Sequence, residues 1–376
     1  MATSPQKKFR VLVVDDSAFM CKVLETIFNA DEHLQVVGKA RDGREAIALA
    51  EALKPDVITM DLNMPHLDGL QATAHIMTSN PRPIVVVSSE TREGAASTLK
   101  ALELGAIEFV TKPSGGIDLD MQSVKEDLLR KVRMAAKVRV VRTASRMVNG
   151  VQSLAAKPRP ANPTPRPTTP ATNFSNDMRF PVVVLAASTG GPATVMRMAP
   201  GFTRDFPAAV FLVQHMPASF TSQYALQLAE FTNIRVKEAE HSESVQPGVL
   251  YICPGGHHLR VAPTGRIQLD ATTGRIDGYL PNIDVTMESV AAFAGAMSIA
   301  VILTGMGCDG ARGARAIKTA GGLVLAQDEA TSVIFGMPDE AIKTGVVEQV
   351  LAIDDIYPAI ERRVLSLSKA LPVGVR

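Results

Sequence analysis

The chain has 376 residues, of which 46% are apolar and 20% are charged, and its formal net charge is +1. This composition is ordinary for a globular protein and excludes a disordered or fibrous chain. Because the length exceeds what one hydrophobic core usually spans, we expect two domains.

Export and membrane insertion are not expected. The first residues, MATSPQKKFRVLVVDD, contain too short an apolar stretch for a signal peptide. The uncharged span from Ser289 to Cys308 is as long as a membrane helix, but its composition changes from alanine-rich to β-branched, which predicts a buried helix and then a buried strand. Three scattered cysteines without C-x-x-C spacing favour a reducing compartment over a disulfide framework or a zinc site. We therefore expect a cytoplasmic protein.

The first domain is expected over residues 9–127, where short β-branched runs alternate with stretches of helical period. The runs are RVLVV, LQVVG, DVITM, PIVVV and IEFV, and the stretches between them include AFMCKVLETIFNA and GLQATAHIMTS. This alternation predicts a doubly wound parallel sheet, in which ligands gather at the carboxyl ends of the strands.

Polar side chains follow four of these predicted strands. They are Asp15 and Asp16, then Asp61, then Ser88, and finally Thr111 and Lys112, which Pro113 follows. Capping of strand ends would explain one such residue, but agreement among four strands favours a single site. Carboxylates grouped at a sheet edge suit a hard cation such as Mg²⁺. Beside that cation and the ammonium of Lys112, we expect Asp61 to attack a phosphoryl group and Ser88 to donate to its oxygens.

The motifs VLVVDDS, DVITMDLNMPHLDG, VVVSS and EFVTKP resemble the receiver domain of two-component response regulators, over the whole first domain. The resemblance implies a flavodoxin-like fold, phosphorylation at Asp61 and a cis peptide before Pro113. It also implies a set of metal-binding and switch residues. These are Asp15, Asp16, Asp61 and the backbone carbonyl of Asn63 for Mg²⁺, and Ser88, Phe109 and Lys112 for the switch.

A basic, proline-rich linker is expected over residues 128–179. Residues 128–176 carry ten basic residues and no acidic one, whereas residues 1–127 carry 13 basic against 19 acidic and residues 177–376 carry 16 against 19. Residues 157–170, KPRPANPTPRPTTP, contain six prolines and cannot pack a core. The preceding stretch predicts a basic helical arm that is either solvated or docked on an acidic face. Without a helix-turn-helix or interleaved aromatic residues, nucleic-acid binding is not expected.

The second domain is expected over residues 180–370. It begins with FPVVVLAASTGGPATVMRMA, which predicts a buried strand, a tight turn and a helix with Pro192 in its first turn. Ser188 therefore lies where a nucleophile elbow presents its serine, although Ala186 replaces the first glycine of G-x-S-x-G. On this motif alone, a capping or phosphate-binding serine is the more common alternative.

Two further predicted strands supply partners for this serine. AAVFLVQHMP leads to His215, and SIAVIL leads to Asp309. Serine, histidine and aspartate at three strand ends can act as nucleophile, general base and orienting carboxylate. His257 and His258 are alternative bases, although a histidine that follows a glycine turn is more often structural.

The loop that carries Asp309 has a second interpretation. Residues 303–313, LTGMGCDGARG, match G-x-G-x-x-G after an apolar run and before a helix, so a nucleotide-dependent oxidoreductase that uses the glycines at 305–310 is an alternative. It is disfavoured because Asp309 would place a carboxylate beside the phosphates.

The motifs ASTGGP, FLVQHMPASF, AVILTGMGCDGARG and LAQDEATSVIFGMPDEAI resemble the catalytic domain of the bacterial chemotaxis methylesterase family. The resemblance implies an α/β methylesterase domain that hydrolyses γ-glutamyl methyl esters on chemoreceptors and also deamidates receptor glutamines. By position, Ser188 is the nucleophile, His215 the base and Asp309 its orienting group. The backbone amide of Met306 and the turn at Ser188 and Thr189 are implied to stabilise the oxyanion.

Two resemblances in one chain imply a phosphorylation-activated hydrolase that gives sensory adaptation in chemotaxis. Its implied partners are chemoreceptor cytoplasmic domains as substrate and a chemotaxis histidine kinase as phosphodonor. Mg²⁺ is implied for the receiver, no cofactor for the catalytic domain, and an unphosphorylated receiver is implied to cover the catalytic edge. The chain departs from the family at Ala186 and at Cys308, whose thiol we interpret as filler. A non-catalytic response regulator that binds a partner or nucleic acid stays an alternative.

Overall fold

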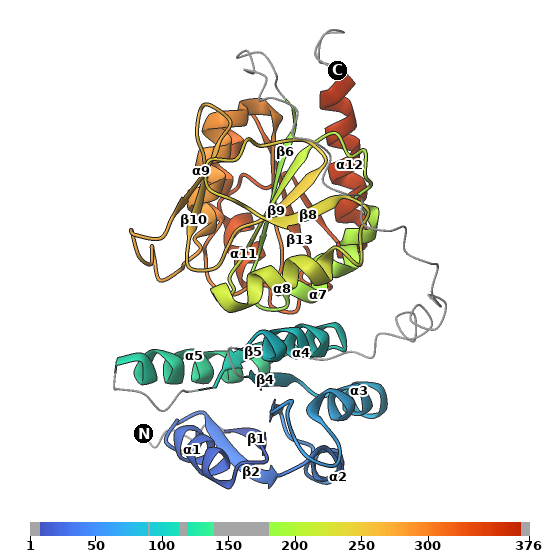
Figure 1. Ribbon diagram of the computed structural model, residues 1–376, viewed down its shortest axis with the longest axis vertical. Coiled ribbons are helices and arrows are strands. Elements are labelled where there is room, and N and C mark those ends of the chain that lie inside the picture. The colour runs from blue at the N-terminus through green and yellow to red at the C-terminus, as the bar shows by residue number, and fades with distance from the viewer. Residues whose placement is uncertain (1–7, 89–90, 113–118, 139–179, 370–376) are drawn as a thin grey trace, which may run out of the picture.

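The computed structural model describes residues 8–88, 91–112, 119–138 and 180–369, which form two α/β bodies that lie against each other (Figure 1). Most of the predicted linker, residues 139–179, lies outside the described residues, and so does Pro113 with the peptide bond before it. The prediction of two doubly wound parallel-sheet domains is confirmed.

The first body is built on a five-stranded parallel sheet. Its elements are β1 (Phe9–Val14), α1 (Ala18–Asn29), β2 (Leu34–Ala40), α2 (Gly43–Leu53), β3 (Val57–Met60), α3 (Gly69–Ser79), β4 (Ile84–Ser88), α4 (Arg92–Glu103), β5 (Glu108–Thr111) and α5 (Leu119–Ala135). The strand order is β2-β1-β3-β4-β5, with every pairing parallel.

Alternating side chains of the central strand build two separate layers of core. Val11 and Val13 of β1 pack with residues of α1 and α5, whereas Leu12 and Val14 pack with residues of α2, α3 and α4. Both faces are therefore covered, which explains why the strands read as continuous apolar runs. Helix α5 contributes Leu128 to this core and so runs past residue 127, the end expected for the first domain.

The second body is built on a larger parallel sheet. Its elements are β6 (Val182–Ala187), α7 (Gly191–Met198), a 3₁₀ turn (Ala199–Gly201), β7 (Ala209–Gln214), α8 (Ala218–Leu228), β8 (Arg235–Glu238), β9 (Val249–Ile252), β10 (His258–Val261), β11 (Ile267–Asp270), α9 (Ile283–Ala294), a 3₁₀ turn (Gly295–Met297), β12 (Ser298–Ile302), α10 (Ala311–Thr319), β13 (Leu323–Gln327), α11 (Gly336–Lys343), β14 (Gln349–Leu351) and α12 (Ile353–Lys369). Seven strands follow the order β14-β13-β12-β6-β7-β9-β8, and β10 and β11 form a separate antiparallel hairpin.

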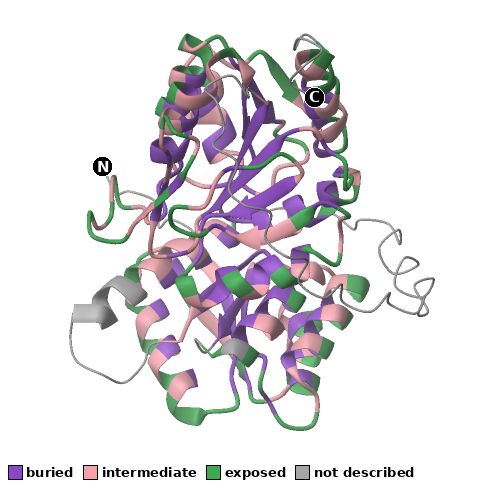
Figure 2. Ribbon diagram, turned by 45° about the horizontal axis from the view of Figure 1, so that its top comes forward, coloured by how far each residue is buried: buried purple, intermediate pink, exposed green. Residues whose placement is uncertain are grey.

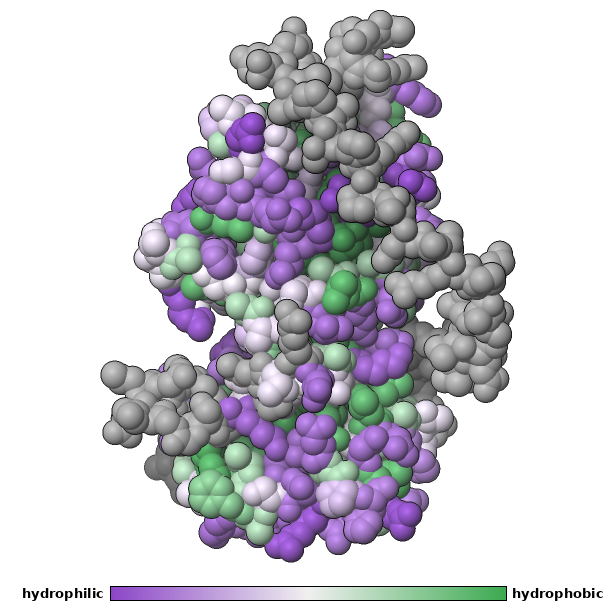
Figure 3. Space-filling view, in the orientation of Figure 1, coloured by the Kyte–Doolittle hydropathy of each residue, from purple (hydrophilic) through white to green (hydrophobic). Residues whose placement is uncertain are grey.

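The three central strands of the second sheet, β12, β6 and β7, are buried along their whole length (Figure 2). The uncharged span that begins at Ser289 folds as predicted, with the end of α9 followed by β12. Within the part of the chain that the structure describes, no helix combines the length and apolar character needed to cross a membrane. Hydrophilic residues cover much of the face shown in the space-filling view (Figure 3).

The two bodies meet through helices. Helix α4 of the first lies on α7 and α8 of the second (Figure 1). Beside it, the Phe109 ring stacks on Phe220 with 4.4 Å between the ring centroids. At the rim of this contact, Gln227 Nε2 donates to Glu103 Oε2 at 3.2 Å. The contact is therefore apolar at its centre and polar at its edge.

Candidate functional site

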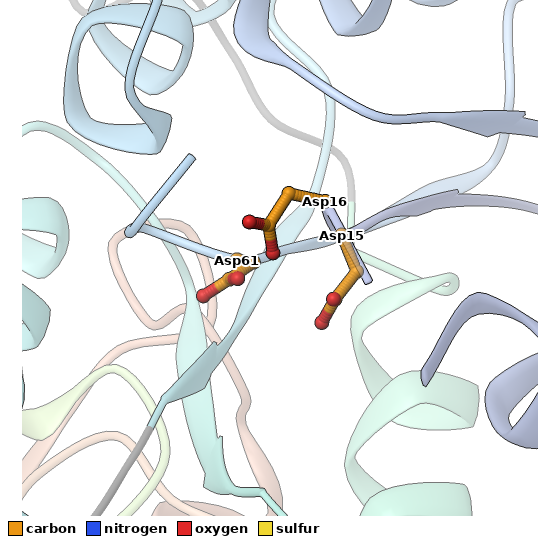
Figure 4. Close-up of side chains that lie close together, drawn as sticks. All are labelled: Asp15, Asp16 and Asp61. Atoms are coloured by element: carbon orange, nitrogen blue, oxygen red, sulfur yellow. The ribbon is translucent and has the colours of Figure 1, made fainter. Parts of the chain in front are cut away.

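The first candidate site is an acidic cluster at the carboxyl edge of the first sheet. Asp15 follows β1 and Asp61 follows β3, and these strands pair in parallel with Val14 opposite Met60. The two carboxylates therefore emerge side by side, joined by that of Asp16 (Figure 4). Oxygen atoms of the three lie within 4.8 Å of one another, while Asp15 is 0% and Asp61 3% exposed.

One ammonium group faces this cluster. Lys112 Nζ lies 2.9 Å from Asp15 Oδ2 and 2.7 Å from Asp61 Oδ2. Burial raises the pKa of Asp61 and prevails over the attraction of Lys112. At Lys112, burial acts to lower the pKa, but hydrogen bonds to Asp61 and Asp15 prevail and raise it. The cluster thus holds more negative charge than Lys112 neutralises, and its oxygen donors suit a hard divalent cation.

The remaining predicted residues of the first domain lie around this cluster. The Asn63 N–H donates to Asp61 Oδ1 at 3.3 Å, so the Asn63 backbone lies beside the carboxylate. Ser88 is buried at the end of β4, and its hydroxyl donates to the Gly94 carbonyl of α4 at 3.2 Å. Phe109 is buried in β5 against the second body. Ser88 and Phe109 therefore connect the acidic edge to the contact between the bodies.

The second candidate site lies where β12, β6 and β7 end side by side. Ser188 follows β6 and His215 follows β7, directly after the paired residues Ala187 and Gln214. The Ser188 N–H donates to the Thr304 carbonyl, which follows β12, at 3.1 Å. Ser188 therefore occupies the middle of the edge, between the strand that presents His215 and the strand that leads to Asp309.

A tight turn presents Ser188. Gly190 has a φ of 75°, a left-handed conformation that favours glycine, and α7 begins at the next residue. Gln214 Nε2 donates to the Ser188 carbonyl at 2.8 Å and so ties this turn to β7. No sequence motif indicated Gln214, although a glutamine that ends an otherwise apolar strand is a signal that its side chain faces a polar neighbour.

The imidazole of His215 is held by the Asp309 carboxylate. Its Nε2 lies 2.8 Å from Asp309 Oδ2, and Asp309 is only 2% exposed. An ionised carboxylate only accepts hydrogen bonds, so Nε2 carries the proton and Nδ1 keeps its lone pair. Among the described residues, Nδ1 has no hydrogen-bond partner. The nitrogen available to act as a base is therefore Nδ1.

Tyr279 is a further neighbour of this base that no sequence motif indicated. Its ring stacks on the His215 ring, with 4.4 Å between centroids and 14° between planes. Its hydroxyl lies against Gly307, where any side chain would collide with it. Burial raises the pKa of Tyr279. The ring thus fills the space between the base and the loop that carries Asp309.

Two backbone amides near Ser188 are candidates for holding an oxyanion. The N–H groups of Thr189 and Met306 donate to no acceptor in the part of the chain that the structure describes. Both residues adjoin the strand ends that present Ser188 and Asp309. Free amides at this position are what a tetrahedral intermediate requires.

The alternative bases are engaged elsewhere. His258 is 0% exposed, with Nε2 2.7 Å from the Gly274 carbonyl, and its Nδ1 accepts from the Asn282 N–H at 3.2 Å. His257 Nδ1 lies 3.2 Å from the Gly255 carbonyl. Since both nitrogens of His258 support a loop, it is structural.

The dinucleotide interpretation also fails on an observed contact. A pyrophosphate would have to accept from the N-terminal N–H groups of α10, but the Asp284 carboxylate already accepts from Gly310 N at 2.9 Å and Gly313 N at 2.6 Å.

The interpretation of the Cys308 thiol as a group that fills space in the core is wrong, because Cys308 is exposed.

Two protein-family models match the chain. A response regulator receiver domain matches residues 11–123, and a CheB methylesterase matches residues 183–360. The protein-glutamate methylesterase/protein-glutamine glutaminase of Pyrococcus abyssi is 42% identical, over 95% of this chain and 94% of its own length. The protein of the same name from Symbiobacterium thermophilum is 41% identical, over 97% of this chain and 99% of its own.

Two solved structures are each similar to a part of this chain. The CheB methylesterase catalytic domain of Thermotoga maritima is 40% identical, covers 49% of this chain and 98% of its own, and has a TM-score of 0.47. The response regulator domain of Thermotoga maritima CheB is 50% identical, covers 36% and 100%, and has a TM-score of 0.33.

Proposed function

The chain belongs to the family of protein-glutamate methylesterases/protein-glutamine glutaminases that carry a receiver domain, and we propose that it removes methyl esters from chemoreceptor glutamates under the control of phosphorylation. It is a hydrolase of chemotaxis adaptation, and its second activity is deamidation of receptor glutamines. The catalytic domain spans residues 180–370 and the receiver begins at residue 9. Because α5 packs on the receiver core as far as Ala135, the receiver includes this helix, and the linker begins after it rather than at residue 128.

One observation carries the catalytic assignment. His215 lies at the strand end next to Ser188, its buried Nδ1 has no hydrogen-bond partner among the described residues, and Asp309 holds its Nε2 at 2.8 Å. Ser188 is accordingly the nucleophile, His215 the general base and Asp309 the group that fixes the tautomer of His215.

The reaction is acyl transfer in two steps. Ser188 Oγ attacks the ester carbonyl and loses its proton to His215 Nδ1, which then protonates the departing methanol. Water attacks the resulting acyl-enzyme, again losing a proton to Nδ1, and the second collapse returns glutamate and the Ser188 hydroxyl. The N–H groups of Thr189 and Met306 stabilise the oxyanion in both steps. With a glutamine substrate, ammonia leaves in place of methanol.

The receiver accepts a phosphoryl group at Asp61. Asp15, Asp16, Asp61 and the backbone carbonyl of Asn63 would hold Mg²⁺, which when bound neutralises charge on the phosphoryl oxygens. Lys112 reaches the same oxygens from the other side, and Ser88 then turns from the Gly94 carbonyl toward them. The motion of Ser88 and Phe109 carries the change to the contact between the domains.

The unphosphorylated receiver restrains the catalytic domain. Three contacts support this: Phe109 stacks on Phe220, Arg130 Nη1 lies 3.9 Å from Met306 Sδ, and Val333 packs both on Gly190 and on the receiver core. Met306 is one of the two residues that we assign to the oxyanion, and Gly190 belongs to the turn that presents the nucleophile. A receiver shift therefore reaches the catalytic loops directly.

The partners follow from the two activities. The phosphodonor is a chemotaxis histidine kinase, and the substrates are the cytoplasmic domains of chemoreceptors. Both place the enzyme in the cytoplasm, without membrane insertion. Mg²⁺ serves the receiver, and the acyl-transfer steps require only residues of this chain.

The proposal is tested by methanol release from a methylated chemoreceptor cytoplasmic domain. Ser188→Ala should lower the rate by roughly four orders of magnitude or more, because the nucleophile is lost. Ser366→Ala, which alters an exposed serine of α12, is the matched control and should keep the wild-type rate. Undiminished methanol release by Ser188→Ala would overturn the catalytic assignment.

A further inference from the structure

Helices α9 and α10 pack side by side and begin next to the carboxylate that holds His215. The first N–H groups of a helix have no partner within the helix and need acceptors from elsewhere. Asp309, which precedes α10, supplies them to α9: its Oδ2 accepts from Ile283 N at 2.8 Å and its Oδ1 from Asp284 N at 2.9 Å. The same carboxylate accepts from His215.

Asp284, in the first turn of α9, does the reverse for α10. Its Oδ1 accepts from Gly310 N at 2.9 Å and from Gly313 N at 2.6 Å. Helix α10 has no capping side chain of its own, because its N-cap is Gly310 with a φ of 100°. Each helix thus takes an N-terminal acceptor from a residue near the start of the other, and α9 also has a cap of its own, because Asn282 Oδ1 accepts from Val285 N at 3.0 Å.

The carboxylates of Asp309 and Asp284 are buried, and partial positive charge surrounds both of them. Asp284 is 5% exposed, and both carboxylates lie in the positive field of a helix N-terminus. Outside the pair, Arg312 Nε lies 3.8 Å from Asp284 Oδ2 and 2.7 Å from Glu288 Oε1. Glu288, one helical turn away, therefore shares the Arg312 side chain of α10 with Asp284, whereas the N–H groups of Gly310 and Gly313 donate to Asp284.

Asp284 fixes the backbone of the loop that carries Asp309. Gly310 is the residue after Asp309, so an acceptor that fixes Gly310 N also fixes the backbone from which the Asp309 carboxylate extends. A displacement of that carboxylate would turn the His215 ring, because the Asp309 oxygen is the only hydrogen-bond partner of Nε2 among the described residues. Small displacements of catalytic groups have large effects on rate.

We propose that Asp284 is a positioning residue for catalysis, which holds the Asp309 loop through Gly310 and Gly313 and so sets the orientation of His215. The proposal rests on the proposed function. Asp284 contacts neither His215 nor Ser188 in the structure, and it acts only through Asp309.

Kinetics of methanol release by the full-length protein test this role. Asp284→Ala should lower kcat on the order of 10- to 100-fold with little change in KM, because the base is misplaced while substrate contacts remain. Asp284→Asn keeps an oxygen for the two N–H groups and should recover most of that loss. The matched control is Glu288→Gln, which removes another of the three carboxylates around Arg312 and should keep the wild-type kcat.

The same change in the Asp309→Asn protein separates an effect on the position of His215 from an effect on the stability of the fold. In Asp309→Asn, the change Asp284→Ala should cause no further loss of kcat, since the residue acts through Asp309. If the thermal unfolding midpoint shows that Asp284→Ala does not fold, Asp284→Ser, whose hydroxyl is too short to accept from both N–H groups, replaces it in both backgrounds. Equal losses in both backgrounds, a loss confined to KM, or wild-type kcat in Asp284→Ala would each overturn the proposal. If Ser188→Ala stayed active, the proposed function itself would fail instead.

Discussion

Aspartate has opposite surroundings at two sites, each at the carboxyl ends of parallel strands. We call them the receiver edge, with Asp15, Asp16 and Asp61, and the catalytic edge, with Ser188, His215 and Asp309. At the receiver edge, three carboxylates meet one ammonium, and burial raises the pKa of Asp61. At the catalytic edge, Asp309 stands among three donors, namely His215 Nε2 and the N–H groups of Ile283 and Asp284. The same kind of sheet edge therefore carries unneutralised charge in one domain and a carboxylate that accepts from three donors in the other.

This difference explains two chemistries on one architecture. Charge in excess attracts a cation and a phosphoryl group, so the receiver edge is a place where a ligand arrives. A carboxylate that already accepts from three donors has little capacity left for a cation, but it holds an imidazole firmly. The partners of an aspartate, more than its place at a strand end, decide its role.

The largest effect is expected from removing the charge of Asp309, which changes the catalytic edge alone. Asp309→Asn should slow methanol release by roughly 10⁴-fold, because the amide no longer fixes the tautomer of His215. Phosphorylation of Asp61 by a small-molecule phosphodonor should continue at the wild-type level. Asp277→Asn, an exposed aspartate in the same region, is the control. A parallel loss of phosphorylation would show that the two edges are not separate sites.

Removal of divalent cations should act on the receiver edge only. With a chelator present, the stimulation of methanol release by phosphodonor, expected to be on the order of tenfold, should vanish, while the basal rate stays unchanged. Addition of Mg²⁺ should restore the stimulation. A fall in the basal rate would break the comparison, since the catalytic edge would then also depend on a cation.

Loss of the aromatic ring beside His215 should have a smaller effect. Tyr279→Leu should lower kcat by about 3- to 10-fold, because the stacked ring no longer keeps the imidazole plane. Tyr279→Phe retains the ring and should behave as wild type. Equal losses in both variants would instead assign the effect to the hydroxyl beside Gly307.

The smallest effect is expected at the contact between the two bodies, where Arg130 lies against Met306. Arg130→Met should raise the basal rate by no more than about fivefold, since a partly exposed contact to Met306 contributes little free energy. Lys137→Met, a basic residue near the same helix outside this contact, is the control. An unchanged basal rate in Arg130→Met would leave Phe109 and Val333 as the contacts that restrain the catalytic loops.

The residues that end strands could be predicted because a parallel sheet turns position in the chain into position at an edge. Asp15 and Asp61 in the first sheet, and Ser188 and His215 in the second, all follow buried apolar runs and meet where expected. The alternation of strand and helix was therefore enough to find both edges and both sets of polar residues.

The residues that hold these groups could not be predicted. Asp284 meets Gly310 only after α9 and α10 pack, and Tyr279 lies in a loop without any period. His258 also could not be excluded as a base, because its engagement with Gly274 and Asn282 depends on loops that are remote in sequence. Such contacts arise from tertiary packing and leave no local pattern.

The central claim is that the charged receiver edge controls the partnered catalytic edge. Its most direct test is methanol release from methylated chemoreceptor with Mg²⁺, measured with and without a small-molecule phosphodonor, for wild type and Asp61→Asn. We expect the phosphodonor to stimulate the wild type but not Asp61→Asn, and the two proteins to have equal basal rates. Stimulation of both proteins, or of neither, would contradict it.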